Sequence, residues 1–193
     1  MRMTPNGEMQ PKTTIMTGMS TTLSDEHLIE LGTVAVHASR LEFAAAELAA
    51  ELLDPKPEVG FALTTCMTFE RLLALVHSLI ELRVNDPQYS ARFEGVRKLA
   101  ESAMRERNRL MHGHWVVSWN HATMRMQDDL ATRARRGRVE VRNNVVISDI
   151  KAVADDLNVA HMQIELLHAN ILRPLGRLVE FEPGKFRRAE DAR

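Results

Sequence analysis

Three side chains suited to phosphate chemistry lie close together near the middle of the chain: Arg107, Asn108 and His112. The guanidinium of Arg107 carries a fixed positive charge on a planar set of donors, which matches the oxygens of a phosphate. His112 belongs to the one residue type that gives and takes a proton near neutral pH without help. The cluster therefore predicts a site that holds a phosphate and moves a proton beside it.

The spacing resembles a known signature, in which an arginine is followed by a polar residue and then, a few positions later, by a histidine. Arg107, Asn108 and His112 fit this pattern without departure, and the motif closes a long predicted helix. In these features the chain is similar to the HEPN superfamily of small helical domains. Many members of that superfamily are metal-independent ribonucleases, often toxins or defence proteins, whereas others only bind or scaffold. The resemblance implies catalytic roles for all three residues and no cofactor.

The resemblance also implies a reaction and a set of partners. A 2'-hydroxyl of RNA would attack the neighbouring phosphate and leave a 2',3'-cyclic phosphate, which needs an acid, a base and positive charge but no metal. One chain offers one motif histidine, His112, so a two-fold homodimer would supply both acid and base. RNA, a second copy of the chain, and an antitoxin or nucleotidyltransferase are the expected partners.

Further basic residues are candidates for RNA binding. Arg109 and His114 flank the motif, and a dense basic run spans residues 133–138. Arginines in such a run contribute salt-sensitive contacts to phosphates, although a solvated loop is the slightly favoured interpretation of the run. The substrate-binding candidates are Arg109, His114, Arg133, Arg135 and Arg136.

Other interpretations of the motif stay open. Arg107 falls in line with an apolar stripe, so it could form a buried salt bridge with Glu70 or Glu81 instead of binding a ligand. His112 could be an ordinary histidine that interacts with the carbonyls of a helix end. A metal site is the least favoured alternative, since His112, His114 and His121 lack a nearby carboxylate or cysteine to complete a zinc site.

Composition is that of an ordinary soluble globular protein. The chain has 193 residues, a formal charge of -1 and one cysteine, which predicts a single domain in a reducing compartment and excludes an intrachain disulfide. We expect a cytoplasmic protein, because no segment is long or apolar enough for a membrane span and the N-terminus does not read as a signal peptide. Cys66, within an apolar segment, is expected to be a buried thiol.

Hydrophobic periodicity predicts helices that position the motif. The first helix runs from a cap at Ser24 to about Leu53, ahead of two prolines. The second covers roughly 61–83 and, being apolar on most sides, should be the central and most buried element. The third covers roughly 88–111 and carries the motif at its end. The last begins after a cap at Ser148 and Asp149 and ends near Pro174.

Residues 114–147 break this pattern. Gly113 is a helix-stop residue, and β-prone segments follow at 115–119, 123–126, 139–141 and 145–147, with a turn expected near Asn143 and Asn144. The predicted fold is all-α: an up-down bundle of four main helices with a small β-hairpin-like excursion between the third and fourth. The domain should span 23–181, between a disordered tail at 1–22 and a charged tail at 182–193.

Overall fold

The structure is a computed structural model that describes residues 23–53, 56–117, 123–127, 140–142, 145–173, 175–176, 178–182 and 185–188. The expected N-terminal tail, the basic run at 133–138 and the turn at Asn143 and Asn144 lie outside these residues. The chain divides into two compact units. We call residues 25–112 with 146–193 the helical unit, and the remainder, which contains residues 113–145, the strand unit.

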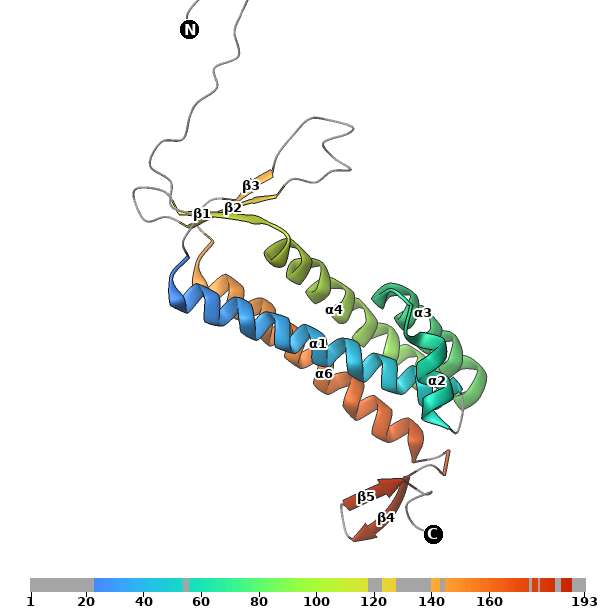
Figure 1. The fold of residues 1–193 in the computed structure, drawn as a ribbon. Coiled ribbons are helices and arrows are strands. Elements are labelled where there is room, and N and C mark those ends of the chain that lie inside the picture. Colours follow the sequence, from blue (N-terminus) through green and yellow to red (C-terminus); the bar gives the residue numbers. More distant parts are fainter. Residues whose placement is uncertain are drawn as a thin grey trace, which may run out of the picture. The chain divides into compact units, whose positions relative to one another are not determined.

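Most of the described chain is helical, which confirms the predicted class (Figure 1). The helices are α1 (Asp25–Leu53), α2 (Pro57–Thr64), α3 (Phe69–Leu79), a π-helix η1 (Ile80–Val84), α4 (Pro87–Met111) and α6 (Ile147–Leu172). The bounds of α1, α4 and α6 follow the sequence prediction to within a few residues. Within the described part of the chain, no helix combines the length and the apolar character that crossing a bilayer demands.

The long helices α1 and α6 lie side by side and run in the same direction (Figure 1). Near their first turns, Lys151 Nζ of α6 lies 3.5 Å from Glu30 Oε1 of α1. Near their last turns, His168 Nε2 lies 3.5 Å from Glu51 Oε2. Because the start of α1 lies beside the start of α6, and the end of α1 beside the end of α6, the two helices are parallel.

Helix α4 runs antiparallel to α6, because Tyr89 Oη at its start donates to the carbonyl of Asn170 near the end of α6 at 3.2 Å. The direction of α1 and α6 differs from the alternation that an up-down bundle requires. The physical reason is the short helix α2, which runs back along α1: Gly60 lies against Ala50, and Phe61 stacks on Phe43. The next helix, α3, therefore begins beside the middle of α1 and runs in the same direction as α1. At the end of α1, the carbonyl of its last residue, Leu53, accepts a hydrogen bond from Nη2 of Arg83 in η1 at 3.1 Å.

The helix predicted at 61–83 is interrupted at residues 65–68. Thr64 and Thr65 turn their hydroxyls back onto the carbonyls of Gly60 and Phe61 at 3.1 and 2.7 Å. The hydroxyl of Thr68 then caps α3 by accepting the N–H of Arg71 at 3.4 Å. Threonine hydroxyls compete with the backbone for hydrogen bonds in this way and favour helix ends.

This interruption corrects two further predictions. Cys66 lies in the turn between α2 and α3 and is exposed rather than buried. The segment is also not the most buried element, since Leu82 is 78% exposed. Complete burial centres instead on α1 and α6, where each large apolar side chain gains about 1.5–3 kcal/mol by leaving water. The largest fully buried side chains include Leu41, Leu48, Leu52, Leu73, Ile80, Phe93, Ile150, Leu157, Ile164, Leu167 and Ile171.

The strand unit contains an antiparallel sheet in the order β1 (His114–Val117), β2 (Thr123–Gln127), β3 (Glu140–Arg142). The β-prone segment at 145–147 is not a strand, because Val146 is the N-cap of α6 and the helix begins at Ile147. In the helical unit, β4 (Leu178–Glu182) pairs with β5 (Lys185–Arg188). This hairpin overlaps the segment for which a frayed charged tail was predicted.

Candidate functional site

The last turn of α4 carries the Arg107, Asn108 and His112 cluster. The helix ends at Met111, and His112 is its C-cap, with φ -102° and ψ 3°. The N–H of His112 still donates to the carbonyl of Asn108, at 3.0 Å, so the cap residue remains attached to the helix. Gly113 comes directly after this cap, so the helix ends where the sequence predicted. The imidazole therefore sits at an exposed helix end on a defined backbone.

Arg107 lies half-buried on the line of the buried residues Ala100 and Ala103, as predicted. Its Nη1 donates to Asn108 Oδ1 at 2.9 Å. Its Nε is covered by protein atoms and has no hydrogen-bond partner in the described structure. A buried donor without a partner is costly, and the few that native proteins keep call for an explanation.

The salt bridge considered for Arg107 does not form within the described residues. Glu70 is exposed on α3, and Glu81 lies instead 3.7 Å from His77. Arg107 thus keeps its charge next to a neutral amide rather than next to a carboxylate. A guanidinium that no carboxylate neutralises is free to pair with an anion.

Asn108 and His112 are both exposed. They are four residues apart, so they project from neighbouring positions on the surface of the helix end. Arg109 points elsewhere, since its Nη1 pairs with Glu106 within the same helix. The structure therefore brings Arg107 and Asn108 into contact, places His112 one turn further on, and engages Arg109 in a local ion pair.

The remaining sequence candidates lie beyond the helical unit. His114 is the first residue of β1 in the strand unit, paired in register with Met126. Arg133, Arg135, Arg136 and His121 fall outside the described residues. Across the residues that the structure does describe, no group of three or more His, Cys, Asp or Glu side chains is arranged to hold a metal ion.

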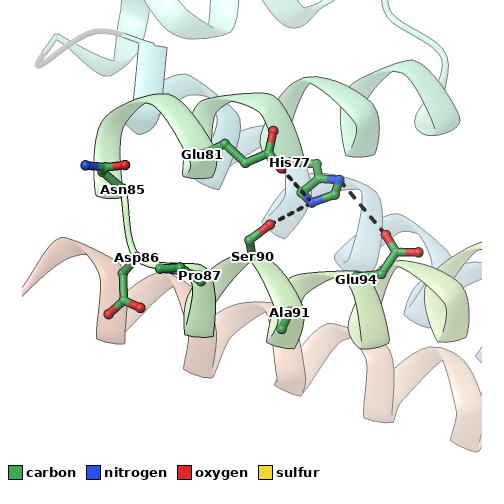
Figure 2. Close-up of a pocket in the computed structure, with 8 residues that line it drawn as sticks. All are labelled: His77, Glu81, Asn85, Asp86, Pro87, Ser90, Ala91 and Glu94. Carbon is green, nitrogen blue, oxygen red and sulfur yellow. Dashed lines mark hydrogen bonds and ion pairs between the residues drawn. The ribbon is translucent and has the colours of Figure 1, made fainter.

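A second polar cluster, which sequence reasoning did not single out, lies at the opposite end of α4. His77 of α3 reaches Ser90 and Glu94 of α4 across a pocket of about 600 Å³ (Figure 2). His77 Nε2 lies 2.9 Å from Ser90 Oγ, and its Nδ1 lies 4.0 Å from Glu94 Oε2. An imidazole, a hydroxyl and a carboxylate from two helices thus converge on one cavity.

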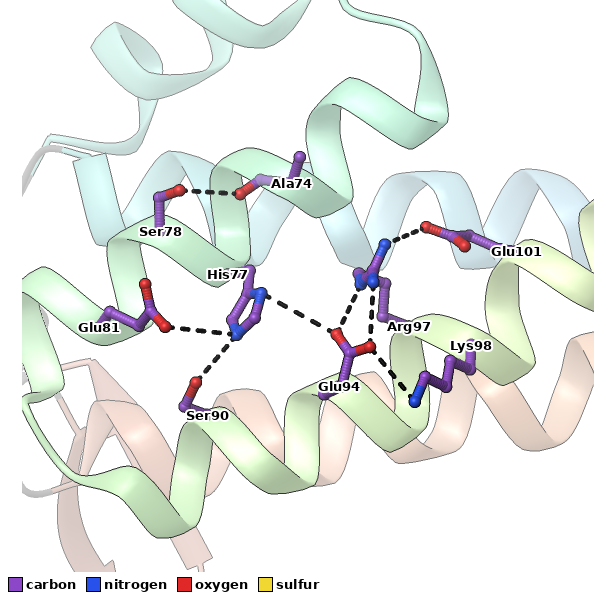
Figure 3. Close-up of polar contacts among 9 residues, drawn as sticks. All are labelled: Ala74, His77, Ser78, Glu81, Ser90, Glu94, Arg97, Lys98 and Glu101. Atoms are coloured by element: carbon purple, nitrogen blue, oxygen red, sulfur yellow. Dashed lines mark hydrogen bonds and ion pairs between the residues drawn. The ribbon is translucent and has the colours of Figure 1, made fainter.

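Arg97 holds Glu94 in place from the other side (Figure 3). Its Nε and Nη2 donate to the two carboxylate oxygens of Glu94 at 2.8 and 3.0 Å, and its Nη1 donates to Glu101 at 2.6 Å. The hydrogen bonds from Arg97 lower the pKa of Glu94 to about 2. Glu94 is therefore ionised throughout the physiological range.

The sequence signal for part of this second cluster is its helical spacing. Four polar residues recur at intervals of three and four along α4 and so share one face of the helix: Ser90, Glu94, Arg97 and Glu101. Spacing within α4 says nothing about which side chain of another helix lies opposite. His77 could be recognised as the partner only once the packing of α3 against α4 was known.

Comparison of the chain with protein-family models, with curated proteins and with solved structures found no match.

Proposed function

We propose that this protein is a metal-independent endoribonuclease of the HEPN type, formed by a bundle of helices with a β-hairpin-like excursion. The arrangement at the end of α4 carries the proposal. Arg107 contacts Asn108 and has no carboxylate partner within the described residues, while His112 lies exposed one turn beyond. A guanidinium without a carboxylate partner, next to an exposed imidazole, is suited to a phosphodiester.

Each of the three residues has a distinct role in the proposed reaction. Arg107 binds the scissile phosphate and offsets the charge that builds up on its oxygens in the transition state. His112 transfers a proton, either from the attacking 2'-hydroxyl or to the departing 5'-oxygen. Asn108 holds the guanidinium through the contact at 2.9 Å and fixes its orientation toward the phosphate. The products are a 2',3'-cyclic phosphate and a 5'-hydroxyl.

A second copy of the chain completes the proposed site. In-line attack requires a base and an acid on opposite sides of the phosphorus, and one chain supplies one motif histidine. A two-fold dimer brings two copies of His112 to one phosphate. Because the formal net charge is -1, attraction to RNA must come from local basic residues rather than from the overall field. Arg109, His114, Arg133, Arg135 and Arg136 are assigned to this binding.

The setting we propose is a toxin or defence system in the cytoplasm. An antitoxin or a nucleotidyltransferase partner would keep such a ribonuclease inactive until it is needed. The alternative is a HEPN-like module that binds or scaffolds without cutting RNA.

A labelled RNA incubated in excess chelator with the wild type, Arg107→Ala, His112→Ala and Arg105→Ala tests the proposal. Arg105 is an exposed arginine of the same helix that lies outside the motif, so its replacement controls for the loss of one positive charge. We expect cleavage by the wild type and by Arg105→Ala, and loss of cleavage in the two motif variants. Binding of RNA without cleavage, unchanged in all four proteins, would favour the scaffold. Cleavage that the chelator abolishes would indicate a metal-dependent hydrolase.

A further inference from the structure

The pocket between α3 and the start of α4 has the features of a reactive site in its own right. It is formed by the end of α3, by η1 and by the first turns of α4, and it has a volume of about 600 Å³ (Figure 2). A π-helix such as η1 often marks a functional position. The residue that follows it, Asn85, adopts a left-handed conformation with φ 52° and also lines the pocket.

Ser90 and His77 have the geometry of a nucleophile and its base. The distance of 2.9 Å between Ser90 Oγ and His77 Nε2 allows a direct hydrogen bond, which is the contact that activates a serine for nucleophilic attack. The opposite ring nitrogen, Nδ1, faces Glu94 Oε2 at 4.0 Å. At this distance Glu94 acts through its charge rather than through a hydrogen bond, and it stabilises the imidazolium that forms when His77 takes a proton.

Two further features favour ionisation of Ser90 during attack. Ser90 lies in the first turns of α4, which begins at Pro87, and the positive end of a helix dipole stabilises an anion that develops there. Glu81 Oε1 lies 3.7 Å from His77 Nε2 and adds a second negative charge beside the protonated imidazole. Among the described residues, the charged groups that face His77 are thus Glu81 on η1 and Glu94 on α4, with Arg97 behind Glu94 (Figure 3).

We propose that Ser90 is a nucleophile for acyl transfer, with His77 as its base and Glu94 as the carboxylate that stabilises the imidazolium. The lining of the pocket sets the class of substrate. Glu81, Asp86 and Glu94 are all acidic, so an anionic substrate is repelled and a carboxylic ester with a positively charged or neutral group is preferred. This site stands independently of the ribonuclease proposal, which rests on the other end of α4.

The reaction has two balanced steps. Ser90 Oγ attacks the ester carbonyl, its proton passes to His77 Nε2, and the C–O bond to the leaving alcohol breaks as that alcohol takes the proton. An acyl-Ser90 ester remains. Water then attacks this ester while His77 again takes and returns the proton, which releases the carboxylic acid and restores the serine hydroxyl.

An alkyl fluorophosphonate tests the nucleophile directly, because Ser90 would displace fluoride and retain the phosphonyl group as a stable adduct. The protein is incubated with this reagent, and the modified residue is located by mass spectrometry of its peptides. We expect an adduct on Ser90 in the wild type and in Ser78→Ala. Ser78 is the matched control, an exposed serine next to His77 in sequence whose hydroxyl donates to the carbonyl of Ala74 at 3.2 Å.

Dependence on the base is the second arm. His77→Gln should slow labelling of Ser90 by roughly 10²- to 10⁴-fold, the usual contribution of a general base. In the wild type the labelling rate should rise with pH as the imidazole loses its proton, and His77→Gln should abolish this rise. His112→Ala should label like the wild type, which separates this site from the RNA site. Absence of a Ser90 adduct in the folded wild-type protein, or equal labelling rates in His77→Gln and the wild type, would overturn the proposal.

Charge preference is the third arm. A p-nitrophenyl ester that carries a trimethylammonium group is compared with one of similar length that carries a carboxylate. We expect the cationic ester to be hydrolysed more than tenfold faster by the wild type, with the preference reduced in Glu81→Gln. Preference for the anionic ester would overturn the substrate class.

Discussion

Arg107 Nη1 donates to Asn108 Oδ1 at 2.9 Å, and this is the contact that joins the two motif residues adjacent in the chain. The amide neutralises none of the positive charge on Arg107, whereas a carboxylate in its place would. The guanidinium is therefore oriented and still charged, which is the state required to bind a phosphate.

Replacing Asn108 tests the importance of this orientation. Asn108→Ala removes the acceptor, so we expect cleavage of RNA to fall about tenfold, a loss of ~1.4 kcal/mol in transition-state stabilisation. Asn108→Asp restores an acceptor oxygen but pairs the arginine with a negative charge, so it should bind RNA more weakly than Asn108→Ala does. The kinetic constants kcat and KM measured for both variants separate orientation from charge. Equal activity of Asn108→Ala and the wild type would remove Asn108 from the site.

Two glycines in the helical unit give opposite predictions for stability. A Cβ on Gly60 would overlap backbone atoms of Ala50, with the carbonyl carbon at 2.6 Å, so α2 could not keep its close approach to α1. Gly32 in α1 has open space where a Cβ would project. Gly60→Ala should destabilise the protein by ~1–3 kcal/mol, as overpacking does. Gly32→Ala should stabilise it by ~0.5–1 kcal/mol. Urea unfolding followed by circular dichroism measures both, and a destabilised Gly32→Ala variant would contradict the described packing of α1.

Arg97 makes the stability of the protein depend on acid pH in a defined window. Hydrogen bonds from Arg97 lower the pKa of Glu94 from its ordinary value of 4.5 to about 2. A carboxyl group whose pKa is depressed by folding contributes stability that is complete above its unfolded pKa and is lost as pH falls through its folded pKa. The contribution of Glu94 should therefore disappear between about pH 4.5 and pH 2.

Arg97→Gln should return the pKa of Glu94 toward its ordinary value, because the charged donor is gone. The carboxyl resonance of Glu94, followed by NMR as pH is lowered, measures this shift. Lys98→Gln is the control, since Lys98 Nζ makes only a longer contact with Glu94, at 3.5 Å, and lowers the pKa of Glu94 less than Arg97 does. A titration of Glu94 near pH 4.5 in the wild type would contradict the described ion pair.

Local sequence signals were sufficient for the element that carries the candidate site. The apolar stripe of α4 and the helix-stop residue Gly113 act over one or two turns, so they predicted both the helix over roughly 88–111 and the position of Arg107 along its apolar stripe. The cap at the start of α4 came only from the structure, where Asp86 Oδ1 accepts the N–H of Gln88 at 2.9 Å. Burial of α6 followed from the same kind of periodicity.

Features that depend on contacts between distant segments could not be predicted in this way. The hydroxyls of three threonines end α2 and cap the start of α3: Thr64, Thr65 and Thr68. Because the apolar pattern of the sequence continues through these residues, it gave no sign of the break between the two helices. The parallel direction of α1 and α6 follows from the chain reversal at that break. The pairing of His77 with Ser90 follows from it as well, since it requires α3 to pack against the first turns of α4.

The ends of the RNA products test the central claim most directly. A labelled RNA is cut by the wild type in excess chelator, and the new 3' end is analysed by mass spectrometry, together with a matched RNA that carries 2'-deoxy sugars at the cleavage positions. We predict a 2',3'-cyclic phosphate, resistance of the deoxy-substituted RNA, and a rate for His112→Ala reduced by roughly 10²- to 10⁴-fold. A 3'-hydroxyl product, or cleavage by His112→Ala at the wild-type rate, would contradict the assignment of Arg107 and His112 to catalysis.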